Sequence, residues 1–210
     1  MALPPGKPGL LIPSTFLRNN RVEHEQIFEG NRRPAWTTAL VFGGYLGVLQ
    51  LTGNFHEVLP AELYRSAQPS AADIATYARQ YGIKTIVNLR GKSMEAWYLQ
   101  EVEAAGHAGI THFDFRLSAA KRVSPQQARQ LIALLQTAPK PILIHCQAGA
   151  DRTGLASMLY LQQIAGTDEE ISERQLSVRY GHIGIPYISA AFAMDESREI
   201  LEEVLFGLTS

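Results

Sequence analysis

The chain contains a single cysteine, Cys146, among its 210 residues. One cysteine cannot form a disulfide within the chain, and a metal site built from several cysteines is excluded as well. The chain also lacks an excess of one charge, because 19 basic and 20 acidic residues give a formal net charge of -1. Nucleic-acid-binding domains carry a clustered basic excess, so we expect no nucleic-acid partner.

Metal-binding patterns and repeats are lacking too. The six histidines include no closely spaced pair of the kind that holds zinc on one helix face, and we therefore expect no metal site. Charge runs, short repeats and low-complexity tracts are absent from the sequence. What remains, with 46% hydrophobic residues, is enough for one α/β domain with a sizeable core and a short extension.

Two N-terminal segments precede that domain. Residues 1–33 hold four prolines and scattered charges without a lasting apolar period, which predicts a flexible N-terminal arm. Residues 34–55 contain no charged side chain, and their apolar middle is just long enough for a membrane helix, which needs about 20 residues. We interpret residues 34–55 as a membrane anchor. The alternatives are a cleaved signal peptide and a helix packed on the soluble domain.

Basic residues lie before this apolar segment and not directly after it. The positive-inside rule would then keep the N-terminus in the cytoplasm and place the following domain outside it, on the periplasmic side. A soluble cytoplasmic protein is the alternative. In the first case the protein is associated with a membrane through residues 34–55.

From residue 57 to residue 210 short β-type runs alternate with amphipathic helical stretches. This alternation predicts one α/β domain with a central, mainly parallel sheet flanked by helices. The expected strands cover 63–67, 84–89, 110–117 and 141–145. The expected helices cover 71–81, 94–105, 124–136 and 153–165, and two more cover 168–180 and 189–206.

The segment after the fourth strand reads His145-Cys-Gln-Ala-Gly-Ala-Asp-Arg-Thr-Gly154. Its small residues allow a tight loop to turn backbone N–H groups inward at the start of a helix, which is an anion-binding arrangement. A helix N-terminus and a nearby cation favour the thiolate form of Cys146, the form that acts as a nucleophile. The planar guanidinium of Arg152 can hold two oxygens of a phosphate. Thr153 could donate a hydrogen bond to the sulfur. His145 either orients the loop or simply packs at the strand end.

Three stretches resemble a known family. His145-Cys146, five residues and Arg152-Thr153-Gly154 match the HCx5R(S/T)G signature of the protein tyrosine and dual-specificity phosphatase superfamily. The stretches Leu63-Tyr-Arg-Ser-Ala-Gln-Pro-Ser70 and Val87-Asn-Leu-Arg90 resemble the bacterial dual-specificity-like phosphatases. The resemblance implies a phosphatase fold, and hydrolysis through a phosphocysteine intermediate without a metal or organic cofactor. It also implies a phosphate-binding loop made of Gln147, Ala148, Gly149, Ala150, Asp151, Arg152 and Thr153.

The chain departs from this family at the general acid. The usual aspartate belongs to the loop here formed by residues 118–123, which contains no carboxylate. Asp151 is the first candidate, because the similar myotubularin-type lipid phosphatases carry an aspartate at that loop position. Asp114 is the second, although it could instead pair with Arg116. A third option is that no side chain serves as a dedicated acid.

The expected substrates are proteins that carry phosphotyrosine, phosphoserine or phosphothreonine. The loop holds no lysine, which favours such substrates over highly charged ones. An inositol phosphate or phospholipid headgroup is the alternative substrate, since Arg65, Arg90 and other basic residues could surround the mouth of the site. A non-catalytic regulator that binds a phosphorylated ligand is the alternative from a different class of protein.

Overall fold

The computed structural model describes residues 35–206, so the flexible arm expected over 1–33 lies outside the described residues. The described residues divide into two units, with the boundary between Phe42 and Gly43. The second unit therefore begins earlier than residue 57, where we expected the domain to start. Helix α1 (Ala35–Leu51) contributes its second half to this larger unit.

Helix α1 is shorter than the apolar segment that contains it. It stops at Leu51 because Gly53 adopts a left-handed conformation (φ 69°) that ends the helical path. Among the helices within residues 35–206, none combines the length and the apolar character needed to cross a bilayer. The expected anchor helix over 34–55 is therefore unsupported. Instead, Leu49 is buried and the Tyr45 hydroxyl donates to the Arg179 carbonyl at 2.5 Å, which fits the alternative of a helix packed on the domain.

Five strands form one mixed sheet in the order β1-β2-β5-β3-β4. Only β1 is antiparallel to its neighbour, so the expected mainly parallel sheet is confirmed. The strands are β1 (His56–Leu59), β2 (Leu63–Ser66), β3 (Thr85–Asn88), β4 (Thr111–Asp114) and β5 (Ile142–His145). Strand β1 was not expected, and β3 and β4 are shorter than the sequence pattern predicted.

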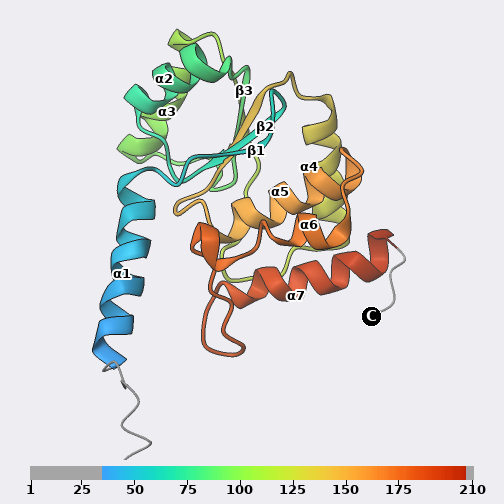
Figure 1. The fold of residues 1–210 in the computed structure, drawn as a ribbon. Coiled ribbons are helices and arrows are strands. Elements are labelled where there is room, and N and C mark those ends of the chain that lie inside the picture. The colour runs from blue at the N-terminus through green and yellow to red at the C-terminus, as the bar shows by residue number, and fades with distance from the viewer. Residues whose placement is uncertain (1–34, 207–210) are drawn as a thin grey trace, which may run out of the picture. The chain divides into compact units, whose positions relative to one another are not determined.

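Helices cover both faces of this sheet (Figure 1). One face carries α2 (Ala71–Tyr81) and α3 (Ala96–His107). The other carries α4 (Pro125–Thr137) and α5 (Asp151–Gln163), with α6 (Glu169–Glu173) and α7 (Phe192–Leu201) packed against α5. Successive side chains of β5 enter opposite cores: Ile142 and Ile144 pack toward α4 and α5, and Leu143 toward α2 and α3. Burial on both faces explains why β5 is almost wholly apolar.

Two helices begin at serines whose side chains accept hydrogen bonds from the free backbone N–H groups of the first turn. Ser70 and Ser124 each form a reciprocal capping box, at the start of α2 and of α4 respectively.

The two C-terminal helices expected over 168–180 and 189–206 are interrupted. The first becomes α6 and a separate 3-10 turn (Val178–Tyr180), and the second becomes α7 and a π-helical turn (Glu202–Phe206).

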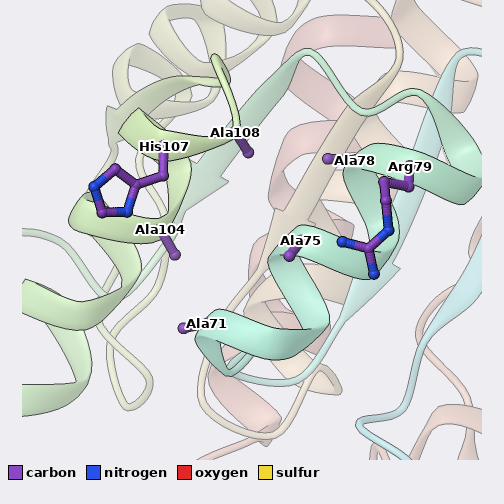
Figure 2. Close-up of a pocket in the computed structure, with 7 residues that line it drawn as sticks. All are labelled: Ala71, Ala75, Ala78, Arg79, Ala104, His107 and Ala108. Atoms are coloured by element: carbon purple, nitrogen blue, oxygen red, sulfur yellow. The ribbon is translucent and has the colours of Figure 1, made fainter.

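A pocket lies between α2 and α3, where alanines leave room between the helices (Figure 2). It is lined by Ala71, Ala75, Ala78, Arg79, Ala104, His107 and Ala108. None of these residues belongs to the cysteine loop. Arg79 and His107 are exposed there and make suitable control positions for substitutions at the candidate site.

Candidate active site

The cysteine loop connects the carboxyl end of the central strand β5 to the first turn of α5. Its tight path depends on Gly149, whose φ of 71° is left-handed. A Cβ at this position would lie 2.6 Å from the backbone nitrogen of Ala67 and from the carbonyl carbon of Ser66. The loop therefore packs directly on the end of β2, and only glycine fits at this point.

The backbone N–H groups of this loop are free. Within residues 35–206, the N–H groups of Gln147, Ala148, Gly149 and Ala150 donate no hydrogen bond. The first N–H groups of α5 lack helical partners as well, as at any helix start. Cys146 lies at the beginning of the loop with only 3% of its surface exposed. This geometry suits an oxyanion held by successive amides next to the sulfur.

Arg152 reaches over the carboxyl ends of the neighbouring strands. Its Nη1 lies 3.4 Å from the carbonyl oxygens of Leu89 and Leu117, which follow β3 and β4. Bonds of this length are weak, so the guanidinium can exchange them for shorter, charge-assisted bonds to phosphate oxygens. The side chain is half-buried and thus remains accessible to a ligand.

Thr153 does not contact the sulfur in the way we expected. Its hydroxyl is buried and has no hydrogen-bond partner within the described chain, and no hydrogen bond joins it to Cys146. Buried hydroxyls without a partner are uncommon. The group is thus available, but its role toward the sulfur stays a prediction.

His145 is oriented by a buried carboxylate. Its Nε2 lies 2.9 Å from Oε1 of Glu101, and the Nε2 of His112 lies 2.7 Å from the same oxygen. Burial alone would raise the pKa of Glu101, but the hydrogen bonds from His112 and His145 hold it at about 2. An ionised Glu101 therefore fixes the ring next to the nucleophile. This residue was missed from the sequence, where it reads as one polar position of the amphipathic helix 94–105.

Arg65 lies behind the loop, so the expected position of Arg65 at the mouth of the site is wrong. The side chain is completely buried, and its Nη2 donates to the carbonyls of Gly149 (2.7 Å) and Ala150 (3.2 Å). Its Nη1 donates to the carbonyl and side-chain oxygens of Gln175, both at 2.8 Å. Burial lowers the pKa of Arg65 to about 10, which leaves it charged at neutral pH. By binding loop carbonyls on one side, Arg65 helps to leave the amides free on the other.

Replacing Arg65 with methionine should destabilise the domain strongly. The change removes four hydrogen bonds and leaves buried carbonyls unpaired, so we expect the free energy of unfolding to fall by roughly 3–5 kcal/mol. Urea denaturation followed by circular dichroism measures this loss. The exposed Arg79→Met is the matched control and should change stability by less than about 0.5 kcal/mol. Equal stability of the two variants would contradict the role assigned to Arg65.

Asp114 is held in a structural network at the end of β4. Its Oδ1 accepts from Asn88 Nδ2 at 2.9 Å and its Oδ2 accepts from the Tyr98 hydroxyl at 2.6 Å. The hydrogen bond to Asp114 raises the pKa of Tyr98 to about 12. Because both carboxylate oxygens accept hydrogen bonds, Asp114 is poorly placed to donate a proton. The expected pairing with Arg116 is not seen.

Asp151 opens α5 directly beside Arg152, and a buried histidine holds it. Its Oδ1 lies 2.7 Å from Nδ1 of His182, and the Nε2 of His182 lies 3.0 Å from Oδ1 of Asp195. Asp151 itself is only half-buried. His182 and Asp195 were missed, because no local pattern connects them with the cysteine loop. Of the two candidate acids, Asp151 is the one that lies in the cysteine loop beside Arg152, and its role as the acid stays a prediction.

A nucleophilic cysteine that opens a ring of free amides, closed by an arginine at a helix start, defines the phosphate-binding loop of the cysteine-based phosphatases. A model of the tyrosine phosphatase family matches residues 43–174, which is more than half of the chain. The chain belongs to the tyrosine phosphatase family.

Individual relatives agree with this assignment. The dual specificity protein phosphatase TpbA of Pseudomonas aeruginosa strain UCBPP-PA14 is 29% identical over 147 residues, or 69% of this chain and 59% of the relative. The chain therefore spans less than two thirds of the length of the curated relatives it matches. The crystal structure of P. aeruginosa TpbA has 26% identity and a TM-score of 0.53, and the match covers 71% of this chain and 91% of that one.

Two further structures are similar. A cysteine-to-serine variant of P. aeruginosa TpbA in complex with phosphotyrosine has 25% identity and a TM-score of 0.53, with the same coverage of 71% and 91%. The core catalytic domain of the PP-IP phosphatase SIW14 from S. cerevisiae has a TM-score of 0.54 at 18% identity, with coverage of 74% and 94%. At that identity, SIW14 shows a shared fold alone.

Proposed function

We propose that this chain is a cysteine-dependent phosphatase that hydrolyses phosphomonoesters through a phosphocysteine intermediate. The observation that carries the proposal is the loop of free amides from Gln147 to Ala150 beside Cys146. In the proposed complex these amides and the Arg152 guanidinium bind the oxygens of the transferring phosphoryl group. Preorganised donors of this kind stabilise the charge that develops on the phosphoryl oxygens.

The proposed reaction has two steps. The Cys146 thiolate attacks phosphorus, the bond from phosphorus to the leaving oxygen breaks, and Asp151 protonates that oxygen. Water then attacks the phosphocysteine, Asp151 accepts its proton, and the bond between sulfur and phosphorus breaks to restore the thiolate. The residues of the site supply each step, so the mechanism requires no metal or organic cofactor.

The proposed substrates are proteins carrying phosphotyrosine, phosphoserine or phosphothreonine. The similarity to the dual specificity phosphatase TpbA and to its variant complex with phosphotyrosine supports this choice. The loop side chains between Cys146 and Arg152 include no base, so the loop itself provides no extra cation for a highly charged substrate.

One observation favours the second candidate, an inositol phosphate or phospholipid headgroup. Arg90 follows Leu89, whose carbonyl contacts Arg152, and so brings a second cation close to the site. Its guanidinium lies 3.5 Å from the centre of the Trp97 ring, and its Nη1 donates to Oε1 of Gln68 at 2.8 Å. A cation held in this way could bind a second phosphate or an acidic residue of a peptide.

A substrate panel tests the proposed function with the full chain and a chelator present. We expect hydrolysis of an aryl phosphate and of phosphopeptides that the chelator does not reduce. Faster turnover of inositol phosphates or phosphoinositides would assign the second candidate instead. Tight vanadate binding without turnover of any substrate would contradict the enzyme and indicate a regulator that binds phosphorylated ligands.

We propose separately that the protein is associated with a membrane and that its phosphatase domain acts outside the cytoplasm. The exposed apolar side chains of Trp36, Leu40 and Val41 and the basic residues that precede them support this proposal. Cell fractionation with the full chain is the test, and we expect the protein in the membrane fraction after a high-salt wash. Recovery in the cytoplasmic fraction would support the soluble alternative and contradict the proposal.

A further inference from the structure

Asp151, His182 and Asp195 form a carboxylate–imidazole–carboxylate chain next to the cysteine loop. Asp151 belongs to α5, Asp195 to α7, and His182 to the segment between the 3-10 turn and α7. The side chain of His182 is 4% exposed, whereas those of Asp151 and Asp195 are 28% and 24% exposed. The buried ring therefore joins two carboxylates that both reach solvent.

The lack of a side chain at Gly184 leaves room for the carboxylate of Asp195. A Cβ at this position would collide with Oδ2 of Asp195, so any residue other than glycine would displace that carboxylate. Both oxygens of Asp195 lie near Nε2 of His182, at 3.0 and 3.2 Å. Asp195 thus fixes the position of the ring, and Nδ1 remains for Asp151.

An imidazole can donate to carboxylates on both sides only when both of its nitrogens carry protons. Burial alone would lower the pKa of His182, but the hydrogen bonds with Asp151 and Asp195 and their charges raise it above the usual 6.5. The charged groups around the ring are Asp151 on α5 and Asp195 on α7. Arg65 on β2 lies one step further away, where its charge interacts with Asp151. Carboxylates at both nitrogens therefore favour the doubly protonated ring, which holds a proton on Nδ1 beside Asp151.

We propose that His182, oriented by Asp195, stores the proton that Asp151 delivers to the leaving oxygen. This inference rests on the proposed function and adds two positioning residues to it. As the phosphorus–oxygen bond breaks, a proton passes from Nδ1 of His182 through Asp151 to the leaving oxygen. In the second step the proton of the attacking water returns through Asp151 to His182, while Asp195 keeps its hydrogen bond with Nε2 of the ring. We call this path from His182 through Asp151 the relay. It explains how the site supplies a proton at neutral pH although the loop 118–123 contains no carboxylate.

The test compares leaving groups and pH in the full chain. With a phosphoserine peptide at pH 7, we expect His182→Gln to lower kcat by about 10²-fold, the lower end of the range for general acid catalysis. Turnover of p-nitrophenyl phosphate, whose leaving group needs little protonation, should fall by less than about threefold. The basic limb of the kcat profile for the peptide should move to lower pH. Asp195→Asn should lower kcat for the peptide and shift the basic limb in the same direction. The exposed control His107→Gln should leave kcat for both substrates and the pH profile unchanged.

The double variant Asp151→Asn/His182→Gln supplies the second readout. If His182 acts through Asp151, the double variant should be no slower than Asp151→Asn alone, because the two residues serve one step. Equal losses on both substrates, an unmoved basic limb or additive losses would overturn the relay. If His182→Gln does not fold, Asp195→Asn tests the relay instead. Its turnover of the phosphoserine peptide is then compared with that of p-nitrophenyl phosphate, and its pH profile is measured.

Failure of the relay can be distinguished from failure of the proposed function. A chain whose turnover persists in Cys146→Ser, or that shows none, would contradict the phosphatase mechanism itself. A chain whose turnover requires Cys146 but is indifferent to His182 and Asp195 would contradict the relay alone.

Discussion

Replacing Cys146 with serine should lower kcat for every phosphomonoester by at least about 10⁴-fold, since loss of a nucleophile has effects of this size or larger. The serine hydroxyl is not ionised at neutral pH and is therefore a far weaker nucleophile than a thiolate. The loop amides and Arg152 are unchanged by the substitution, so the variant should still bind substrate. Steady-state kinetics with p-nitrophenyl phosphate measure the first effect, and calorimetric titration with a phosphotyrosine peptide measures the second.

One outcome of this substitution would oppose the mechanism, and a second would show that the variant is not a clean test of it. Substantial turnover by Cys146→Ser would mean that another group attacks phosphorus. Loss of peptide binding together with turnover would mean that the serine disturbs the loop, and the kinetic result would then say nothing about the nucleophile. A circular dichroism spectrum and a thermal melt like those of the unchanged chain are the necessary control.

Arg152→Lys should reduce kcat by about 10³-fold, within the range known for arginines that stabilise phosphoryl transfer. Lysine keeps the positive charge but presents a single ammonium, which cannot hold two phosphate oxygens in one plane. It also loses the position that the guanidinium takes against the carbonyls of Leu89 and Leu117. Steady-state kinetics with p-nitrophenyl phosphate measure this effect, as they do for Cys146→Ser.

The matched control for Arg152 is Arg79→Lys, at the exposed end of α2. This control should retain full activity, because Arg79 lines the pocket between α2 and α3 and makes no contact with the cysteine loop. An Arg152→Lys variant with kcat near that of the unchanged chain would show that charge alone suffices. The bidentate role of Arg152 would then be wrong.

The parts of the fold and site that sequence patterns predicted are local. The apolar run of β5, the small residues of the loop and the start of α5 are contiguous, so the positions of Cys146 and Arg152 follow from their order along the chain. Capping serines likewise act within one turn of the helix they begin. Strand β1 was missed because four residues with partial burial carry little alternation.

The parts that could not be predicted depend on contacts between distant segments. Glu101 pairs with His145 at the end of β5, and His182 pairs with Asp151 at the start of α5. Both pairs form only in the folded chain, and no spacing in the sequence indicates them. Arg65 was noticed in its motif, but which side of the loop it contacts depends on how β2 packs beside β5. The apolar segment over 34–55 has a composition that suits a bilayer and a protein surface alike. In the structure Tyr45 contacts the phosphatase domain, whereas Trp36, Leu40 and Val41 are exposed, and no local sequence signal separates these two parts of the segment.

The central claim is that phosphate is transferred to the sulfur of Cys146. Rapid acid quenching during turnover of p-nitrophenyl phosphate, followed by mass spectrometry of the digested protein, tests this claim most directly. We predict that the peptide containing Cys146 gains one phosphoryl group on sulfur within the first turnover and loses it when substrate is exhausted. Rapid turnover with Cys146 unmodified at every quench time, or a phosphoryl group on another residue, would contradict it.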